Sequence, residues 1–190
     1  TFDLRRRRDR MSIAMVIAID QSGSMGVEVS PGRNKLDLAN EAAARSALLL
    51  SVNDRVGVMH VDTAVHWTQA MTSVQQPEDI AAAVRRAQVG GGGIFVDITL
   101  EASYAALSAE STQLRHLLLF SDGDDSEEMT RAHALVQNAA TAAGGEITTS
   151  IVSMGNGVDT PQLERLSTLG GGRFYIVEDM TELPRIFTQE

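Results

Sequence analysis

The sequence has no cysteine and no long apolar run, and each absence removes a class of protein. Without a cysteine among its 190 residues, the chain can form neither a disulfide nor a thiolate-ligated metal centre. No apolar stretch approaches the roughly 20 residues that a membrane-spanning helix needs, and no segment has the pattern of a signal peptide. Because a cysteine-free domain suits oxidising and reducing compartments alike, the compartment stays open at this point.

Positive charge is also scarce in this chain. It carries 16 Lys and Arg against 25 Asp and Glu, a formal net charge of -9. This balance argues against a nucleic-acid binder, which needs a basic surface to displace counterions. The one basic run covers residues 5–8 and is followed by Arg10. We interpret it as a solvated linker, and contact with anionic lipid or nucleic acid is the alternative.

The length of the chain and its 43% of hydrophobic residues suit one domain with a large core. We divide the chain into an N-terminal arm, residues 1–10, and a single domain, residues 11–190. The first residue is Thr1 and not methionine, and the last residue, Glu190, ends an apparent helix. We therefore expect this domain to be a segment of a longer protein.

Apolar runs that alternate with helical patterns define the expected fold. The unbroken run at 13–19 predicts a buried parallel strand. Further strands are predicted at 56–61, 64–68, 114–120, 146–153 and 173–177, and helices at 35–50, 77–87, 96–108, 125–143, 160–169 and near Glu182. The turn before 64–68 is too short for a crossover, so this strand is expected to be antiparallel. The pattern predicts a three-layer α/β/α, Rossmann-like fold with a mostly parallel central sheet and one antiparallel edge strand.

Two local signals complete the expected order of elements. Glycine, serine and proline are frequent between residues 23 and 32 and predict a loop there. Asp125 and Glu128 have capping-box spacing and are expected to begin the helix at 125–143.

Acidic loops stand directly after two of the predicted strands. Asp20-Gln21-Ser22-Gly23-Ser24 follows the strand at 13–19, and Asp122 follows the strand at 114–120. If the two strands are neighbours, both loops lie outside the carboxyl end of the sheet, where open α/β sheets bind ligands. Two carboxylates so close need a shared proton or a cation between them, and we favour the cation. Carboxylate and hydroxyl oxygens suit the hard cations Mg²⁺, Mn²⁺ and Ca²⁺.

These motifs resemble those of a von Willebrand factor A domain. The resemblance rests on Asp20-x-Ser22-x-Ser24, on Leu119-Phe120-Ser121-Asp122-Gly123 and on Gly170-Gly171-Gly172-Arg173-Phe174-Tyr175, and it extends from Met11 to about Phe187. It implies a metal-ion-dependent adhesion site in which Ser22 and Ser24 bind the cation directly, while Asp20 and Asp122 bind it directly or through water. The remaining position would take a carboxylate from a partner protein. The resemblance thus implies a cation-dependent protein-interaction module without catalytic residues.

Residue 94 departs from the pattern of this family. The family usually has a threonine after two glycines, whereas this chain has Gly92-Gly93-Ile94, and isoleucine cannot coordinate a cation. Water could take the vacant position, Asp97 or Thr99 could supply a ligand, or the site could bind metal weakly or not at all. A third carboxylate, from Asp97, would make the cation less attractive to an acidic partner.

The segment Gly-Gly-Gly-Ile-Phe-Val, residues 91–96, also resembles the A domains of bacterial membrane-anchored proteins that carry glutamine-amidotransferase-like segments. This narrower resemblance implies that the parent protein is anchored in a bacterial cell envelope. The side of the membrane on which the domain lies stays open.

Other functions fit the sequence less well. A scaffold with a degenerate site would bind its partner without metal, and Ile94 favours that alternative. A phosphotransfer enzyme would use Asp20 as nucleophile, Mg²⁺ as cofactor and Asp122 as a metal ligand, but such sites need a second Asp where this chain has Ser22. His60 and Asp62 could belong to a second metal site, although a buried histidine with a hydrogen-bonded ring is the interpretation we favour.

Overall fold

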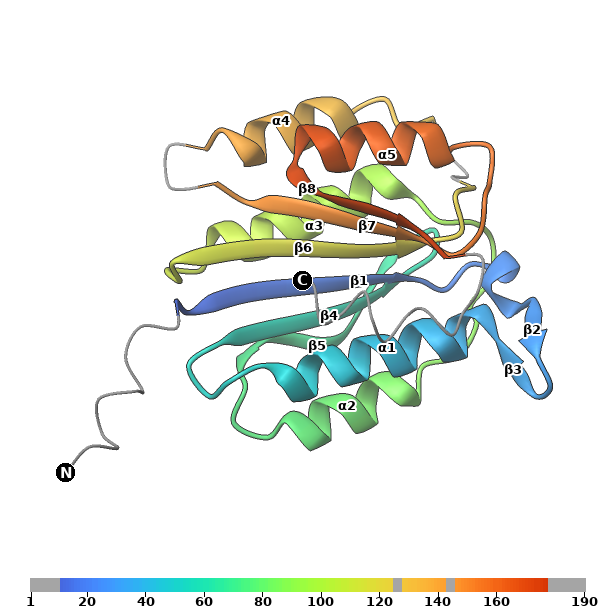
Figure 1. Ribbon diagram of the computed structural model, residues 1–190, viewed down its shortest axis with the longest axis horizontal. Coiled ribbons are helices and arrows are strands. Elements are labelled where there is room, and N and C mark those ends of the chain that lie inside the picture. The colour runs from blue at the N-terminus through green and yellow to red at the C-terminus, as the bar shows by residue number, and fades with distance from the viewer. Residues whose placement is uncertain (1–10, 125–127, 143–145, 178–190) are drawn as a thin grey trace.

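The computed structural model describes residues 11–124, 128–142 and 146–177, and its centre is a six-stranded sheet in the order β5-β4-β1-β6-β7-β8 (Figure 1). The strands are β1 (Ile13–Asp20), β4 (Arg55–Val61), β5 (Val65–Ser73), β6 (Leu114–Ser121), β7 (Thr148–Ser153) and β8 (Gly171–Ile176). Neighbouring strands are parallel except for β5, which pairs antiparallel with β4. The mostly parallel sheet with one antiparallel edge strand is therefore confirmed.

Helices cover both faces of the sheet and give the expected three layers. They are α1 (Lys35–Leu49), α2 (Pro77–Arg85), α3 (Val96–Ser108), α4 (Ala132–Ala140) and α5 (Thr160–Leu169). Successive residues of β1 point to opposite faces. Ile17 packs with residues of α1 and α2 in one apolar cluster, whereas Val16 packs with residues of α3, α4 and α5 in the other. Within the described ranges, no helix is both long and apolar enough to cross a membrane.

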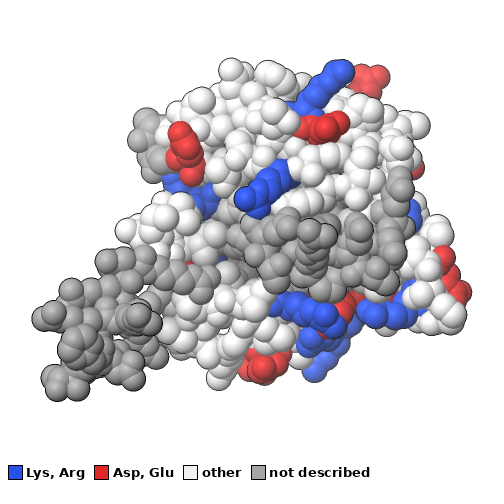
Figure 2. Space-filling view, viewed as in Figure 1, with Lys and Arg blue, Asp and Glu red and all other residues white. Residues whose placement is uncertain are grey.

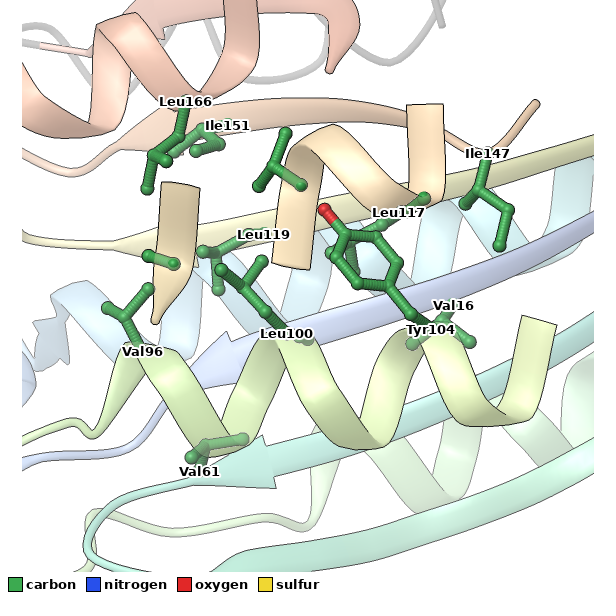
Figure 3. Packing of buried hydrophobic residues seen from close by; sticks show 14 of the residues in the cluster. Val16, Val61, Val96, Leu100, Tyr104, Leu117, Leu119, Ile147, Ile151 and Leu166 are labelled. Atoms are coloured by element: carbon green, nitrogen blue, oxygen red, sulfur yellow. The ribbon is translucent and has the colours of Figure 1, made fainter. Parts of the chain in front are cut away.

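The cluster on the α3 side holds the two central strands firmly in place. Figure 3 shows Val16 of β1 and Leu117 of β6 facing Leu100 and Tyr104 of α3. Tyr104 is buried, and its hydroxyl makes a 2.7 Å hydrogen bond with Thr149 Oγ1. Each fully buried aliphatic side chain contributes about 1.5–3 kcal/mol relative to an exposed one. Close packing against α3 thus fixes the positions of β1 and β6, including their carboxyl ends.

The structure differs from the sequence-based expectation in two loops. The stretch expected to be a loop contains a short 3-10 helix, η1 (Gly23–Gly26), and a small antiparallel hairpin of β2 (Glu28–Ser30) and β3 (Arg33–Asn34). The helix expected from residue 125 begins only at Ala132. Asp125 and the helix expected near Glu182 lie outside the residues that the structure describes.

Charges on the α1 and α2 side neutralise one another. Glu41 of α1 accepts from Arg45 Nε and from Arg85 Nε, both at 2.8 Å. Hydrogen bonding from Arg85 lowers the pKa of Glu41 to about 2. Basic and acidic side chains also lie side by side in the lower part of Figure 2. Opposite charges on this side of the molecule therefore pair with one another.

Candidate cation site

The sheet topology brings the two acidic loops to one edge. β1 and β6 are parallel neighbours in a register that pairs Ile19 with Phe120, so Asp20, one residue after Ile19, and Asp122, two residues after Phe120, emerge at the same edge of the sheet. Asp20 is completely buried, and Asp122 is 4% exposed. An edge of this kind, at the carboxyl ends of neighbouring parallel strands, is where open α/β sheets place their ligands.

Backbone hydrogen bonds fold the loop after β1 over Asp20. Asp20 Oδ1 accepts from the backbone N–H of Ser22 at 2.7 Å, and the hydroxyl oxygens of Ser22 and Ser24 lie 3.0 Å apart. Gly23 N–H donates to the carbonyl of Gly92 at 3.0 Å, which ties the loop around Gly92 to the loop after β1. The structure therefore brings the Asp20 carboxylate, two serine hydroxyls and the backbone around Gly92 into one small region.

Burial dominates the electrostatics of Asp20. Removal from water raises its pKa to about 6, hydrogen bonds from Ser22 oppose this rise, and the nearby charge of Asp122 adds to it. The hydroxyl of Ser121 lies 3.5 Å from Asp20 Oδ2. A buried acid whose charged form is destabilised in this way gains from any positive charge placed beside it.

The two oxygens of Asp122 have different surroundings. Oδ2 lies 3.3 Å from the ammonium of Lys35. Oδ1 is buried and has no hydrogen-bond partner among the described residues. A buried carboxylate oxygen without a partner is costly unless a ligand or water satisfies it. Together with Asp20 and the two serine hydroxyls, this free oxygen makes a donor set that fits a hard divalent cation.

Each of the additional ligands considered from sequence has one oxygen that makes a contact outside the Asp20–Asp122 edge. Asp97 Oδ2 accepts from the backbone N–H of Arg131 at 2.9 Å and lies 3.3 Å from Thr130 Oγ1, so it caps the start of α4. Its other oxygen is buried and has no partner within the described part of the chain. Thr99 Oγ1 donates to the carbonyl of Phe95 at 2.8 Å. The contacts of Asp97 and Thr99 thus stabilise the starts of α4 and α3, respectively.

Ile94 is fully buried and packs in the apolar cluster under α3, α4 and α5. Its side chain contributes to the core at the point where the family pattern has a threonine. A donor is therefore missing at this position, as the sequence indicates.

His60 is the buried histidine that we favoured on sequence grounds. Its Nδ1 lies 2.6 Å from Thr68 Oγ1, and its Nε2 lies 2.8 Å from Asn40 Oδ1. Asn40 donates its own amide N–H to the carbonyl of Ala87, so its Oδ1 faces the ring as an acceptor and Nε2 carries the proton. Burial, with a smaller contribution from His66, lowers the pKa of His60 to about 4. A ring satisfied on both sides does not ligate a metal with Asp62.

Lys35 is the site residue that sequence reasoning missed. It comes from the first turn of α1 and is far along the chain from Asp122, its partner. A lysine in the first turn of a helix opposes the helix dipole, and that local conflict is the signal that could have pointed to it. Among the described residues, no group of three or more His, Cys, Asp or Glu side chains could hold a metal, so the candidate site depends on its hydroxyls.

Comparison with known proteins covers almost the whole chain. The von Willebrand factor type A domain model matches residues 14–189, and no curated protein matches the chain. A von Willebrand factor type A structure from Catenulispora acidiphila is 20% identical with a TM-score of 0.81, over 94% of this chain and 42% of that one. An aerotolerance-related membrane protein from Bacteroides fragilis is 13% identical with a TM-score of 0.77, over 94% and 98%. The protein BatB from Bacteroides thetaiotaomicron is 14% identical with a TM-score of 0.78, over 94% and 97%. At these identities the likeness to the solved structures concerns the fold.

Proposed function

The chain belongs to the von Willebrand factor type A family, and from that premise we propose that its Asp20–Asp122 edge is a divalent-cation site that binds a partner protein. Proteins of this family often mediate protein–protein interactions. The observation that carries the proposal is the pair of buried carboxylates beside two hydroxyls, with Asp122 Oδ1 left without a partner. Mg²⁺ is the cation we propose first, with Mn²⁺ and Ca²⁺ as alternatives.

Each residue has a definite task in this proposal. Ser22 and Ser24 supply neutral oxygens, and the loop hydrogen bonds hold them next to Asp20. Asp20 and Asp122 supply the negative charge, directly or through water. A bound cation would provide an electrophilic position that a carboxylate of the partner can occupy, and no bond is broken. The proposed partner therefore presents an acidic side chain.

Full burial of Asp20 disfavours the phosphotransfer alternative, because a nucleophile has to reach its substrate. A metal-independent scaffold is the second candidate function. It is favoured by Lys35, whose ammonium already supplies one positive charge to Asp122, and by Ile94 in place of a ligand.

We also propose a membrane-associated bacterial parent protein, on the likeness to the aerotolerance-related membrane protein.

Thermal unfolding with and without cation tests the proposal. A cation at about 100 times its dissociation constant stabilises the folded state by about 2.7 kcal/mol. In a domain of this size that corresponds to a rise in Tm of about 5–10 °C. We expect this rise with millimolar Mg²⁺, Mn²⁺ or Ca²⁺ in the unaltered protein, and a much smaller rise in Ser22→Ala.

The matched control is Ser111→Ala, because Ser111 is exposed just before the amino end of β6, at the opposite edge of the sheet. It should keep the full response to cation. If none of the three cations changed the Tm of the unaltered protein, and if that Tm equalled the Tm of Ser22→Ala, the cation site would be contradicted. The metal-independent scaffold would then be the remaining candidate function.

A further inference from the structure

Lys35 reaches into the candidate cation site from an unfavourable place. It is the first residue of α1, where the positive end of the helix dipole disfavours a cation. Nevertheless its Nζ lies 3.3 Å from Asp122 Oδ2, and its side chain is only 19% exposed. The charge of Asp122 in the loop after β6 is thus what offsets the unfavourable position of the ammonium.

The surroundings of the ammonium place it at the same sheet edge as the site. A Cβ built on Gly155, in the loop after β7, would lie 3.8 Å from Lys35 Nζ. The backbone N–H of Lys35 donates to the carbonyl of Val27 at 3.1 Å, which joins the start of α1 to the segment that follows η1. The ammonium therefore lies among the start of α1, the loop after β6 and the loop after β7.

The two oxygens of Asp122 leave room for a second positive charge beside that of Lys35. Oδ2 is taken by Lys35, and the buried Oδ1 has no partner among the described residues. A cation bound at Oδ1 would lie within a few ångströms of the ammonium, and like charges so close in a partly buried place repel strongly. Lysine has a long, flexible stem, so the ammonium can leave for solvent when that repulsion arises.

We propose that Lys35 is an internal competitor for the cation. Without metal its ammonium neutralises Asp122 and keeps the edge folded, and binding of a divalent cation displaces it. Lys35 thereby weakens cation binding and makes occupancy of the site depend on the surrounding cation concentration. This inference rests on the proposed cation site and adds the residue that regulates it.

Calorimetric titration with Mg²⁺ and Mn²⁺ tests the competition. Lys35→Met keeps most of the apolar stem and removes the charge, and we expect its cation affinity to rise about tenfold, a common size for coupling between two ligands. Arg33→Met is the control, because Arg33 lies two residues away, is exposed and has the same charge. It should change the affinity by less than about twofold, because exposed charges are screened.

Stability without cation gives a second readout. Lys35→Met should melt at a lower temperature than the unaltered protein in chelator, because Asp122 loses its counter-charge. It should also show the larger rise in Tm when Mg²⁺ is added. Lys35→Gln, which can still hydrogen-bond to Asp122, replaces it if the Met variant does not fold, and Lys35→Arg should restore the original affinity.

The outcomes separate this inference from the proposed function. Cation binding by the unaltered protein with the same affinity in Lys35→Met and Lys35→Gln overturns the competition and leaves the cation site standing. Cation binding by the unaltered protein, with an affinity that rises about tenfold in Lys35→Met and by less than about twofold in Arg33→Met, supports the competition. No binding by any variant overturns both.

Discussion

Ile94 packs in the core at the position where the family pattern has a threonine. Its side chain is fully buried in the apolar cluster beneath α3, yet its neighbour Gly92 touches the loop that carries Ser22 and Ser24 through the bond to Gly23. A threonine at this position, as in the family pattern, would keep one methyl group for the core and replace the rest of the branch with a hydroxyl. The chain has an isoleucine, which contributes to packing and has no oxygen donor.

A hydroxyl introduced at position 94 should therefore lower the stability of the fold and raise its affinity for a cation. We expect Ile94→Thr to lower the free energy of unfolding without cation by about 1–3 kcal/mol, because a buried methyl group is lost and a methylene is replaced by a buried hydroxyl. We expect it also to tighten Mg²⁺ binding, as measured by calorimetric titration. Ile94→Val has nearly the same shape as Ile94→Thr but no hydroxyl. It should lower the free energy of unfolding and leave the affinity for Mg²⁺ unchanged. Equal affinities for the Thr and Val variants would show that position 94 does not reach the cation.

At the scale of elements, the start of α1 is where a local motif fixes the geometry of the site. Asn34 Oδ1 accepts from the backbone N–H of Asp37 at 2.8 Å, and Asp37 Oδ2 accepts from the N–H of Asn34 at 2.9 Å. This reciprocal pair is a capping box. It defines the first turn of the helix and so the point from which Lys35 extends to Asp122.

Removing this cap should loosen the element without altering the chemistry of the site. We expect Asn34→Ala to lower the free energy of unfolding by about 1 kcal/mol, measured by urea denaturation. Asn34→Ser keeps an acceptor for the Asp37 N–H and should recover most of that loss. If the Ala and Ser variants were equally destabilised, the side-chain cap would not be what stabilises this helix start.

Element prediction from sequence succeeded where burial dictates the pattern and failed where it does not. The run at 13–19 is apolar because β1 is buried on both faces, so it reads as a strand. β2 is exposed along its whole length, as its burial pattern shows, and no apolar alternation marks it in the sequence. A capping box that no sequence-based expectation named forms between Asn34 and Asp37.

At the scale of the whole molecule, the fold accounts for the part of the site that the sequence could predict. Parallel neighbours at the centre of a doubly covered sheet end at the same edge, so Asp20 and Asp122 could be expected to meet. The contact between Lys35 and Asp122 joins α1 to the loop after β6. The lysine in the first turn of α1 is a local signal, but its partner depends on how the layers pack, and no local pattern of residues indicates that it is Asp122.

The pH dependence of global stability also reflects packing between layers. His60 of β4 is held by Thr68 of β5 and Asn40 of α1, and burial lowers its pKa to about 4 from 6.5. The unfolded chain therefore takes up a proton near pH 6.5, where the folded protein does not. The stability that depends on neutral His60 is complete above that pH, falls as the pH drops, and is lost by the folded-state pKa.

We expect His60→Gln to remove this dependence. Between about pH 6.5 and pH 5, the free energy of unfolding of the unaltered protein should fall relative to that of the variant by about 2 kcal/mol, as measured by urea denaturation across the range. Asp20, whose raised pKa has the opposite effect, is common to both proteins and cancels in the difference. His133→Gln, at an exposed position of α4, should keep the dependence of the unaltered protein. If the curves of the unaltered protein and His60→Gln ran parallel, His60 would be protonated as easily in the folded state as in the unfolded chain, and its burial between β4, β5 and α1 would carry no electrostatic cost.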